Sequence, residues 1–247
     1  MLIYDMHSHL YEHSDREIEE ILEADKTLVI VAVSDDASSL ERTWSLHEAY
    51  DDRVIPCGGY HPWNLKEGGS VEEARRAARL AERLGVRCIG EVGLDRKFLP
   101  GSTWSLQVEV YKLFIGLARE LGAMLNIHAP GAWRDALEMA VEGGVERGML
   151  HWYTGPQDLI MSIAEAGFYA SINPAIRIQE KHRGIASLAP LDVLVFESDS
   201  PYNYRGLRLS PLMVRESMET VARIKGVSLD TVMERAYMNS RRLLGLS

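Results

Sequence analysis

Eight short apolar runs, rich in β-branched residues, recur along the chain and alternate with stretches of helical periodicity. Alternating strands and helices predict a parallel sheet, and eight strands are the number that closes into a (β/α)₈ TIM barrel. The alternative is an open, doubly wound sheet. Its phosphate-binding glycines would follow the first strand, where residues 7–13 contain none. The predicted strands cover residues 2–7, 27–33, 53–60, 86–93, 123–129, 147–153, 167–173 and 191–198.

The helical stretches fill the remainder of the predicted α/β barrel. Residues 70–85 and 106–122 both end in glycine, which often terminates helices. After the last strand, residues 210–226 and 228–245 predict two terminal helices, so the barrel carries an extra C-terminal helix. Because the sequence has no long linker, low-complexity tract or close repeat, we expect a single domain over residues 1–247.

Composition restricts the environment and the partners. No apolar run approaches the ~18 residues of a membrane helix and no signal-peptide pattern is present, so we expect a soluble, cytoplasmic protein. The net charge of −9 argues against binding of long duplex DNA through its phosphates. It still allows a local site where metal ions supply positive charge. No stable protein partner is inferred. Cys57 and Cys88 lack CxxC spacing and are expected to be buried free thiols rather than a disulfide.

Histidines and carboxylates gather where the predicted strands end. His7 and His9 are two residues apart at the end of the first strand, so both side chains can reach one ion. The C-terminal strand ends of a TIM barrel converge on one mouth, where active sites are built. Each residue alone has an ordinary structural explanation, but their coincidence on one rim predicts a metal site. The seven potential ligands are His7, His9, His61, Glu91, His128, His151 and Asp199.

A second layer of polar residues lies two positions before three of these ligands. Asp5, Asn126 and Glu197 share a side of their strands with His7, His128 and Asp199. We expect this layer to support the metal-bound imidazoles through hydrogen bonds, the alternative being a hydrated interior layer. The remaining histidines, His13, His47 and His182, are expected to be solvated surface residues. A substrate role is left open for His13 and His182.

The ordered series "DMHSH", "GGYHPW", "GEVGLD", "NIHAP", "HWYTG" and "ESDSP" resembles the TatD family of metal-dependent hydrolases, within the amidohydrolase-like superfamily. This resemblance implies two divalent metal ions. The resemblance implies that His7, His9 and Asp199 hold the first ion and that His128 and His151 hold the second. It also implies that Glu91 bridges the two ions and that His61 lies near the substrate. The sequence departs from the family after the fifth strand, where "HAPGAWRDA" displaces Arg134, and in the bulky aromatics of "HWYTG".

Two metal ions about 3.5–4 Å apart suit displacement at phosphorus by an activated water. Asp199 is the expected general base and His61 a stabiliser or proton donor, so the predicted catalytic residues are Asp199, His61 and Glu91. Imidazole and carboxylate ligands suit Zn²⁺, Mn²⁺, Co²⁺ or Fe²⁺, and the family resemblance adds Mg²⁺.

Cations for a phosphate are sparse near the predicted mouth. The loops after the seventh and eighth strands contain Arg177, Lys181, Arg183, Arg205 and Arg208. Arg177 and Arg205 lie nearest the strands and are the predicted substrate-binding residues. Aromatic residues that follow the ligand motifs are expected either to stack on a base or to fill the mouth; they are Trp63, Trp133, Trp152 and Tyr153.

These features favour a phosphodiesterase, in particular a deoxyribonuclease acting on single-stranded or frayed DNA ends. Hydrolysis of a small phosphodiester, ester, lactone or amide by the same metal centre is the alternative, because the loops after the fifth and sixth strands are altered. A non-catalytic metal-binding protein is the third hypothesis.

Overall fold

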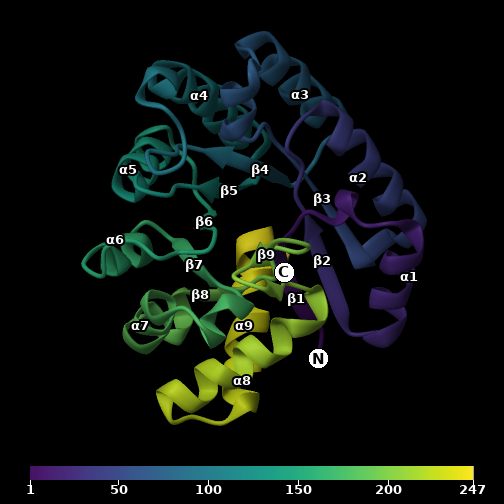
Figure 1. Ribbon diagram of the computed structural model, residues 1–247, viewed down its shortest axis with the longest axis vertical. Coiled ribbons are helices and arrows are strands. Elements are labelled where there is room, and N and C mark those ends of the chain that lie inside the picture. The colour runs from purple at the N-terminus through teal and green to yellow at the C-terminus, as the bar shows by residue number, and fades with distance from the viewer. Residues whose placement is uncertain (247) are drawn as a thin grey trace.

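The computed structural model describes residues 1–246, apart from the side chain of Glu67. Eight parallel strands pair in chain order around a barrel, which confirms the predicted (β/α)₈ fold (Figure 1). The ring is completed beyond the last strand, where the Asp199 N–H donates to the His7 carbonyl at 2.9 Å. The barrel strands are β1 (Ile3–Ser8), β2 (Leu28–Ala32), β3 (Val54–Gly58), β4 (Cys88–Gly93), β5 (Met124–His128), β6 (Gly148–Leu150), β7 (Phe168–Ile172) and β8 (Leu194–Phe196).

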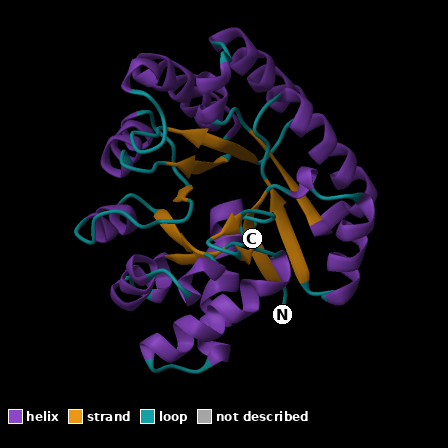
Figure 2. Ribbon diagram, in the orientation of Figure 1, coloured by secondary structure: helices purple, strands orange, loops and turns teal. Residues whose placement is uncertain are grey.

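Helices surround the strands on the outside (Figure 2). None of those in residues 1–246 combines the length and apolar character needed to cross a membrane. The α-helices are α1 (Asp15–Ala24), α2 (Ala37–Tyr50), α3 (Val71–Leu84), α4 (Trp104–Leu121), α5 (Trp133–Glu142), α6 (Leu159–Glu165), α7 (Glu180–Leu188), α8 (Val214–Lys225) and α9 (Leu229–Leu244). A small hairpin follows β8, formed by β9 (Asn203–Tyr204) and β10 (Leu207–Arg208).

Helix α3 shows how the sequence specifies this outer layer. The Ser70 hydroxyl accepts from the Glu73 N–H at 3.3 Å, and the Glu73 carboxylate accepts from the Ser70 N–H at 2.8 Å, which forms a capping box. The helix ends at Gly85, whose φ of +63° is left-handed and costs glycine little. Ala77 and Ala81 are fully buried, and their small side chains let the helix pack closely on the strands.

The barrel interior near the N-terminal ends of the strands is apolar. One buried cluster takes at least one side chain from each of the eight strands and is completed by Leu243 and Leu244 of α9. Figure 1 shows α9 passing behind the strand ring near its centre, so this helix closes one end of the barrel. The strand members of the cluster are Tyr4, Met6, Val29, Val31, Cys57, Cys88, Met124, Met149, Tyr169 and Val195.

The two cysteines of this cluster correct one sequence prediction. Cys57 and Cys88 form a disulfide with an S–S distance of 2.03 Å, rather than two free thiols. They are direct partners in the ladder between β3 and β4, and their Cα atoms are 4.4 Å apart. Sequence alone could not show this pairing, because it depends on the register of two strands separated by a helix.

Candidate metal centre

Glu91 of β4 lies at the centre of the predicted ligand cluster. Five imidazoles approach its carboxylate from the surrounding strand ends, and the whole side chain is buried. The Glu91 oxygens lie 3.5 Å from His7 Nε2, 3.4 Å from His9 Nε2, 3.4 Å from His61 Nε2, 2.8 Å from His128 Nδ1 and 3.6 Å from His151 Nε2.

Asp199 reaches the same cluster from the loop after β8. Its Oδ1 lies 3.5 Å from Nε2 of both His7 and His9, and the residue is 6% exposed. Its backbone has a φ of +54°, an uncommon conformation for a non-glycine residue. Hydrogen bonds from the Asp199 N–H to the His7 carbonyl and from the Tyr202 N–H to the Asp199 carbonyl hold this turn in place. The strand-end spacing therefore brings together all six predicted ligands.

Two glycines let the Glu91 strand approach its neighbours. A Cβ on Gly90, whose φ is +154°, would lie 2.6 Å from the Cβ of Asn126. A Cβ on Gly93, at φ +151°, would lie 1.9 Å from the His128 carbonyl oxygen. Larger residues at these positions would separate β4 from β5 and move Glu91 away from His128. The pattern Gly-Glu-Val-Gly is therefore a packing requirement of the centre.

The predicted second layer lies behind the imidazoles, but its members make different contacts. Asn126 Oδ1 lies 2.9 Å from His7 Nδ1, and Glu197 Oε1 lies 3.0 Å from His151 Nδ1. Asp5 instead accepts from the backbone N–H groups of His7 and Ser198, at 3.3 and 2.7 Å. Burial raises the pKa of Asp5 to about 7. Asp5 thus holds the backbone between β1 and β8 rather than an imidazole ring.

Two further carboxylates that the sequence analysis did not select contact the ligand histidines. Asp95 Oδ2 lies 3.0 Å from His128 Nε2 and also accepts from the Trp63 indole at 2.8 Å. Asp35 Oδ1 lies 3.4 Å from His9 Nδ1, and its other oxygen accepts from the Tyr11 hydroxyl at 2.9 Å. Asp95 ends the "GEVGLD" motif, so the sequence carried a signal for it. Asp35 follows β2, and because no ligand was predicted on that strand, nothing in the sequence marked Asp35 as a site residue.

These contacts determine which nitrogen of each neutral imidazole faces the centre. The Asn126 amide donates to the Met6 carbonyl at 3.0 Å, so its oxygen is left to accept a proton from His7 Nδ1. By the same reasoning Glu197 takes the proton of His151 Nδ1, which leaves a lone pair on Nε2. Asp35 Oδ1 lies at an ion-pair distance of 3.4 Å from His9 Nδ1 without a hydrogen bond between them, and the ring places His9 Nε2 at the centre, 3.4 Å from Glu91.

His128 and His61 differ from the other three. Asp95 accepts from His128 Nε2, so the Nδ1 of His128 presents its lone pair toward Glu91. His61 Nδ1 accepts from the Trp63 N–H at 3.1 Å, which places the proton of the neutral ring on Nε2. His61 therefore presents an N–H group to the centre, whereas the other four histidines present lone pairs.

The electrostatics of the cluster are dominated by attraction between its imidazoles and carboxylates. Burial alone would raise the pKa of Glu91, but His61, His7 and His151 hold it well below its usual range. Burial alone would lower the pKa of His128, but Asp95 and Glu91 raise it to about 9. In the metal-free protein, protons on His7, His9 and His128, whose pKa values are raised, thus balance the buried carboxylates, and a cation would have to displace them.

The donor set fits divalent cations. Trios whose ligand atoms lie within 4.8 Å of one another include His7, His9 and Asp199, and also His7, Glu91 and His151. A tetrahedral ion with ligands at 2.1 Å separates them by about 3.4 Å. The distances of 3.4–3.6 Å from Glu91 to Nε2 of His7, His9 and His151 match that spacing. So do the distances of 3.5 Å from Asp199 to Nε2 of His7 and His9.

A cavity of about 360 Å³ opens above the cluster, and its walls are largely aromatic. Trp152 has a left-handed φ of +44°, held by bonds from its N–H to Ser171 Oγ at 2.8 Å and Glu197 Oε1 at 2.9 Å. Its indole lies edge-on to Tyr202 and Tyr204, with ring centroids 5.7 and 5.2 Å apart. The aromatic lining residues are Trp63, Phe98, Trp133, Trp152, Tyr202 and Tyr204.

The two arginines predicted to bind substrate lie outside this cavity's described lining. Arg177 forms an ion pair with Glu216 of α8 at 2.9 Å, and both side chains are about half exposed. Arg205 lies in the turn of the β9–β10 hairpin, with its guanidinium 5.4 Å from the Tyr204 ring centroid. The cation that does line the cavity is Lys97, from the loop after β4.

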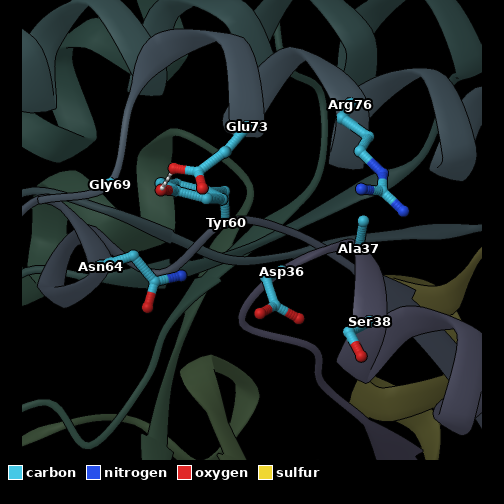
Figure 3. Close-up of a pocket in the computed structure, with 8 residues that line it drawn as sticks. All are labelled: Asp36, Ala37, Ser38, Tyr60, Asn64, Gly69, Glu73 and Arg76. Atoms are coloured by element: carbon cyan, nitrogen blue, oxygen red, sulfur yellow. Dashed lines mark hydrogen bonds between the residues drawn. The ribbon is translucent and has the colours of Figure 1, made fainter. Parts of the chain in front are cut away.

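A second hollow, of about 300 Å³, lies between the N-terminal ends of α2 and α3 (Figure 3). Its Tyr60 hydroxyl donates to Glu73 at 3.2 Å, and Arg76 has no ion-pair partner among the described side chains. With Asp36, the described lining contains two carboxylates and no imidazole, so it lacks the ligand chemistry of the metal centre.

Two histidines expected at the surface are buried, which corrects the prediction. The first is His13, whose Nε2 lies 2.9 Å from the Ser200 hydroxyl. His47 is half-buried, and its Nδ1 lies 2.8 Å from the Val54 carbonyl oxygen. His182 is fully buried: its Nε2 accepts from the Asn173 N–H at 3.0 Å, and its Nδ1 faces the Tyr153 carbonyl at 3.2 Å. His182 thus connects the loops after β6 and β7, a structural role.

Burial lowers the pKa of His182 to about 4, below the value of about 6.5 for an unfolded chain. Protonation therefore favours unfolding, and the contribution of His182 to stability falls as the pH drops below about 6.5. From pH 7 to pH 5 this residue should lower the free energy of unfolding by about 2 kcal/mol. Urea unfolding at pH 7 and pH 5 measures this change. The free energy of unfolding should decrease less between the two pH values for His182→Gln than for the wild type. An equal decrease in both proteins would show that His182 is not the titrating group.

Comparison with known proteins agrees with this geometry. A TIM barrel whose C-terminal mouth holds inward imidazoles and shared carboxylates defines the class of metal-dependent hydrolase barrels. The chain belongs to the TatD related DNase family, which matches residues 4–245, so the predicted resemblance is confirmed.

The relatives cover nearly the whole chain. Human deoxyribonuclease TATDN3 is 29% identical over 263 residues, which include 98% of this chain and 94% of that protein. The uncharacterized metal-dependent hydrolase YcfH of Escherichia coli K12 is 31% identical over 258 residues, covering 98% and 96%. The crystal structure of YjjV, a TatD homologue of E. coli K12, has a TM-score of 0.88 at 19% identity, with 99% and 98% of the chains covered, and shows the same fold.

Proposed function

We propose that this protein is a metal-dependent phosphodiesterase that removes nucleotides from single-stranded or frayed DNA ends. The observation that carries the proposal is the arrangement around Glu91, in which four imidazole lone pairs and two carboxylates converge beneath an aromatic cavity. The naming of the human relative as a deoxyribonuclease supports the same reaction. The volume of about 360 Å³ suits one nucleotide rather than a duplex.

Two cations are proposed, with Glu91 shared between them. His7, His9 and Asp199 would hold one, and His128 Nδ1 with His151 Nε2 would hold the other. When bound, such ions polarise a phosphoryl oxygen and lower the pKa of a water molecule.

Asp199 is the proposed general base. Its carboxylate is buried beside His7 and His9, and these neighbours keep its pKa below the usual range despite burial, so it is ionised at neutral pH. An ionised carboxylate at the cavity floor can accept the proton of the attacking water and pass it to the leaving oxygen.

His61 is proposed as a proton donor rather than a metal ligand. The Trp63 N–H occupies its Nδ1, and its Nε2–H points toward Glu91 at the floor of the cavity. That N–H can donate to a phosphoryl or leaving-group oxygen. Asn126, Glu197 and the newly found Asp35 and Asp95 orient the four ligand rings.

Hydrolysis of a carboxylic ester, lactone or amide is the second candidate. It is favoured by the aromatic walls and by the single lysine among the described lining residues, since a neutral substrate needs no cationic pocket. Both reactions would use the same ligands and the same base.

One assay separates the two candidates. Protein reconstituted with Zn²⁺, Mn²⁺ or Mg²⁺ is tested against single-stranded DNA, bis(p-nitrophenyl) phosphate and a panel of lactones and amides. We expect metal-dependent release of nucleotides and hydrolysis of the diester. Turnover of carboxylic substrates alone would reject the nuclease, and full metal occupancy without any turnover would favour a non-catalytic metal-binding protein.

A further inference from the structure

The cavity above the metal centre continues into a larger groove of about 750 Å³. The two share Lys97, Pro130, Trp133, Thr154 and Gln179 among their lining residues, so they open into each other. The groove runs over the loops after β4 to β7, on the side of the barrel covered by α4 to α7 in Figure 1. It contains none of the metal ligands.

Two lysines line the groove, one shared with the cavity and one in the unshared part. Lys97, at the junction with the cavity, has its ammonium group 4.7 Å from the Phe98 ring centroid. Its backbone N–H donates to Asp95 at 2.7 Å, so its position is tied to the carboxylate that orients His128. Lys181 lies in the first turn of α7, beyond the shared residues. Neither lysine forms an ion pair with another described residue, and both are exposed.

The charges around the metal centre are asymmetric. Glu12 and Asp35 line the cavity on the side of β1 and β2, and the adjacent hollow of Figure 3 adds Asp36 and Glu73 against Arg76. A polyanion leaving the centre in that direction would meet four lining carboxylates and one arginine, which is an unfavourable balance of charge.

On the opposite side, Lys97 and Lys181 face a single lining carboxylate, Glu180. Gln179 continues the polar surface, and its Oε1 accepts from the Trp152 indole at 2.9 Å, which holds it at the junction. The uneven charge therefore selects the groove as the exit for a phosphate chain, despite the net charge of −9.

We propose that this groove, from Lys97 to Lys181, binds the nucleotides that follow the terminal one, as a single-stranded segment. Lysine ammonium groups would contact its phosphates, and Trp133 is part of the groove wall. The proposal rests on the nucleic-acid substrate of the proposed function, and it replaces Arg177 and Arg205 as the predicted phosphate contacts.

The test measures binding, so it does not require turnover. Tryptophan fluorescence quenching is recorded for metal-loaded wild-type protein and Lys181→Ala with phosphorothioate-linked oligothymidylates, one a dinucleotide and one an octanucleotide. We expect Lys181→Ala to weaken octanucleotide binding about five- to tenfold and dinucleotide binding less than twofold. The slope of log K against log salt concentration, which is negative, should become less negative by about 0.7 for the octanucleotide.

Lys112→Ala, an exposed lysine of α4 outside the groove, is the matched control and should bind both lengths like the wild type. Lys181→Arg should keep most of the affinity, because it keeps the charge. Equal losses for both lengths, or no loss with the octanucleotide, would overturn the groove assignment. If the protein hydrolyses the diester but Lys181→Ala shows no length-dependent loss of affinity, only the groove assignment is rejected. If the affinity loss depends on length but the diester is not hydrolysed, only the proposed reaction is rejected.

Discussion

Asp199→Asn is expected to lower kcat for a phosphodiester substrate by about 10³-fold, within the range for removal of a general base. Asparagine has nearly the same shape, so the turn at Asp199 and its backbone bonds to β1 should persist. Its amide cannot accept the proton of the attacking water. Initial rates at saturating metal and substrate measure the effect, and metal content measured in parallel separates lost catalysis from lost binding.

Asp52→Asn is the matched control, because Asp52 is exposed and lies before β3, at the end of that strand opposite the metal centre. It should retain wild-type activity. If Asp199→Asn kept full activity at full metal occupancy, the assignment of the base would be wrong.

Glu91→Gln is expected to have the second large effect, on metal content as well as on activity. Among the described side chains, Glu91 is the one carboxylate within 3.6 Å of nitrogens from His7, His9, His61, His128 and His151. A neutral amide removes the negative charge that favours two cations in one buried cluster. We expect bound metal after dialysis to fall to half or less of the wild-type amount, and kcat/KM to fall by more than about 100-fold.

Elemental analysis of dialysed protein gives the metal-to-protein ratio. Glu142→Gln, at the exposed end of α5, serves as the control and should leave that ratio unchanged. An unchanged ratio in Glu91→Gln would contradict the shared position proposed for this residue.

Much of the candidate centre could be predicted from the chain because a TIM barrel converts strand ends into one rim. His7, Glu91, His128 and Asp199 are far apart in sequence, yet each follows or ends a recognisable apolar run. Hydrophobic periodicity therefore sufficed to place them together. Asp35 also follows an apolar run, that of β2, and Tyr11 lies in the short 3-10 helix after β1, but their contacts with each other and with His9 depend on how these segments pack.

The cations show the opposite case. Arg177 and Arg205 are near strand ends in sequence, but Arg177 pairs with Glu216 of α8 and Arg205 lies in a hairpin turn. Lys97 and Lys181 line the continuous groove instead. Long, flexible side chains in loops are directed by neighbours from other elements, and chain position says little about those neighbours.

The sequence by itself determined the barrel and predicted the candidate metal-centre residues, because strand and helix periodicity and strand-end chemistry are local properties of the chain. Only the tertiary structure decided the disulfide between Cys57 and Cys88, the burial of His182 and the groove lined by Lys97 and Lys181. It also decided which nitrogen each imidazole presents, as in His61, whose Nδ1 is occupied by Trp63. These features depend on contacts between segments that only packing brings together.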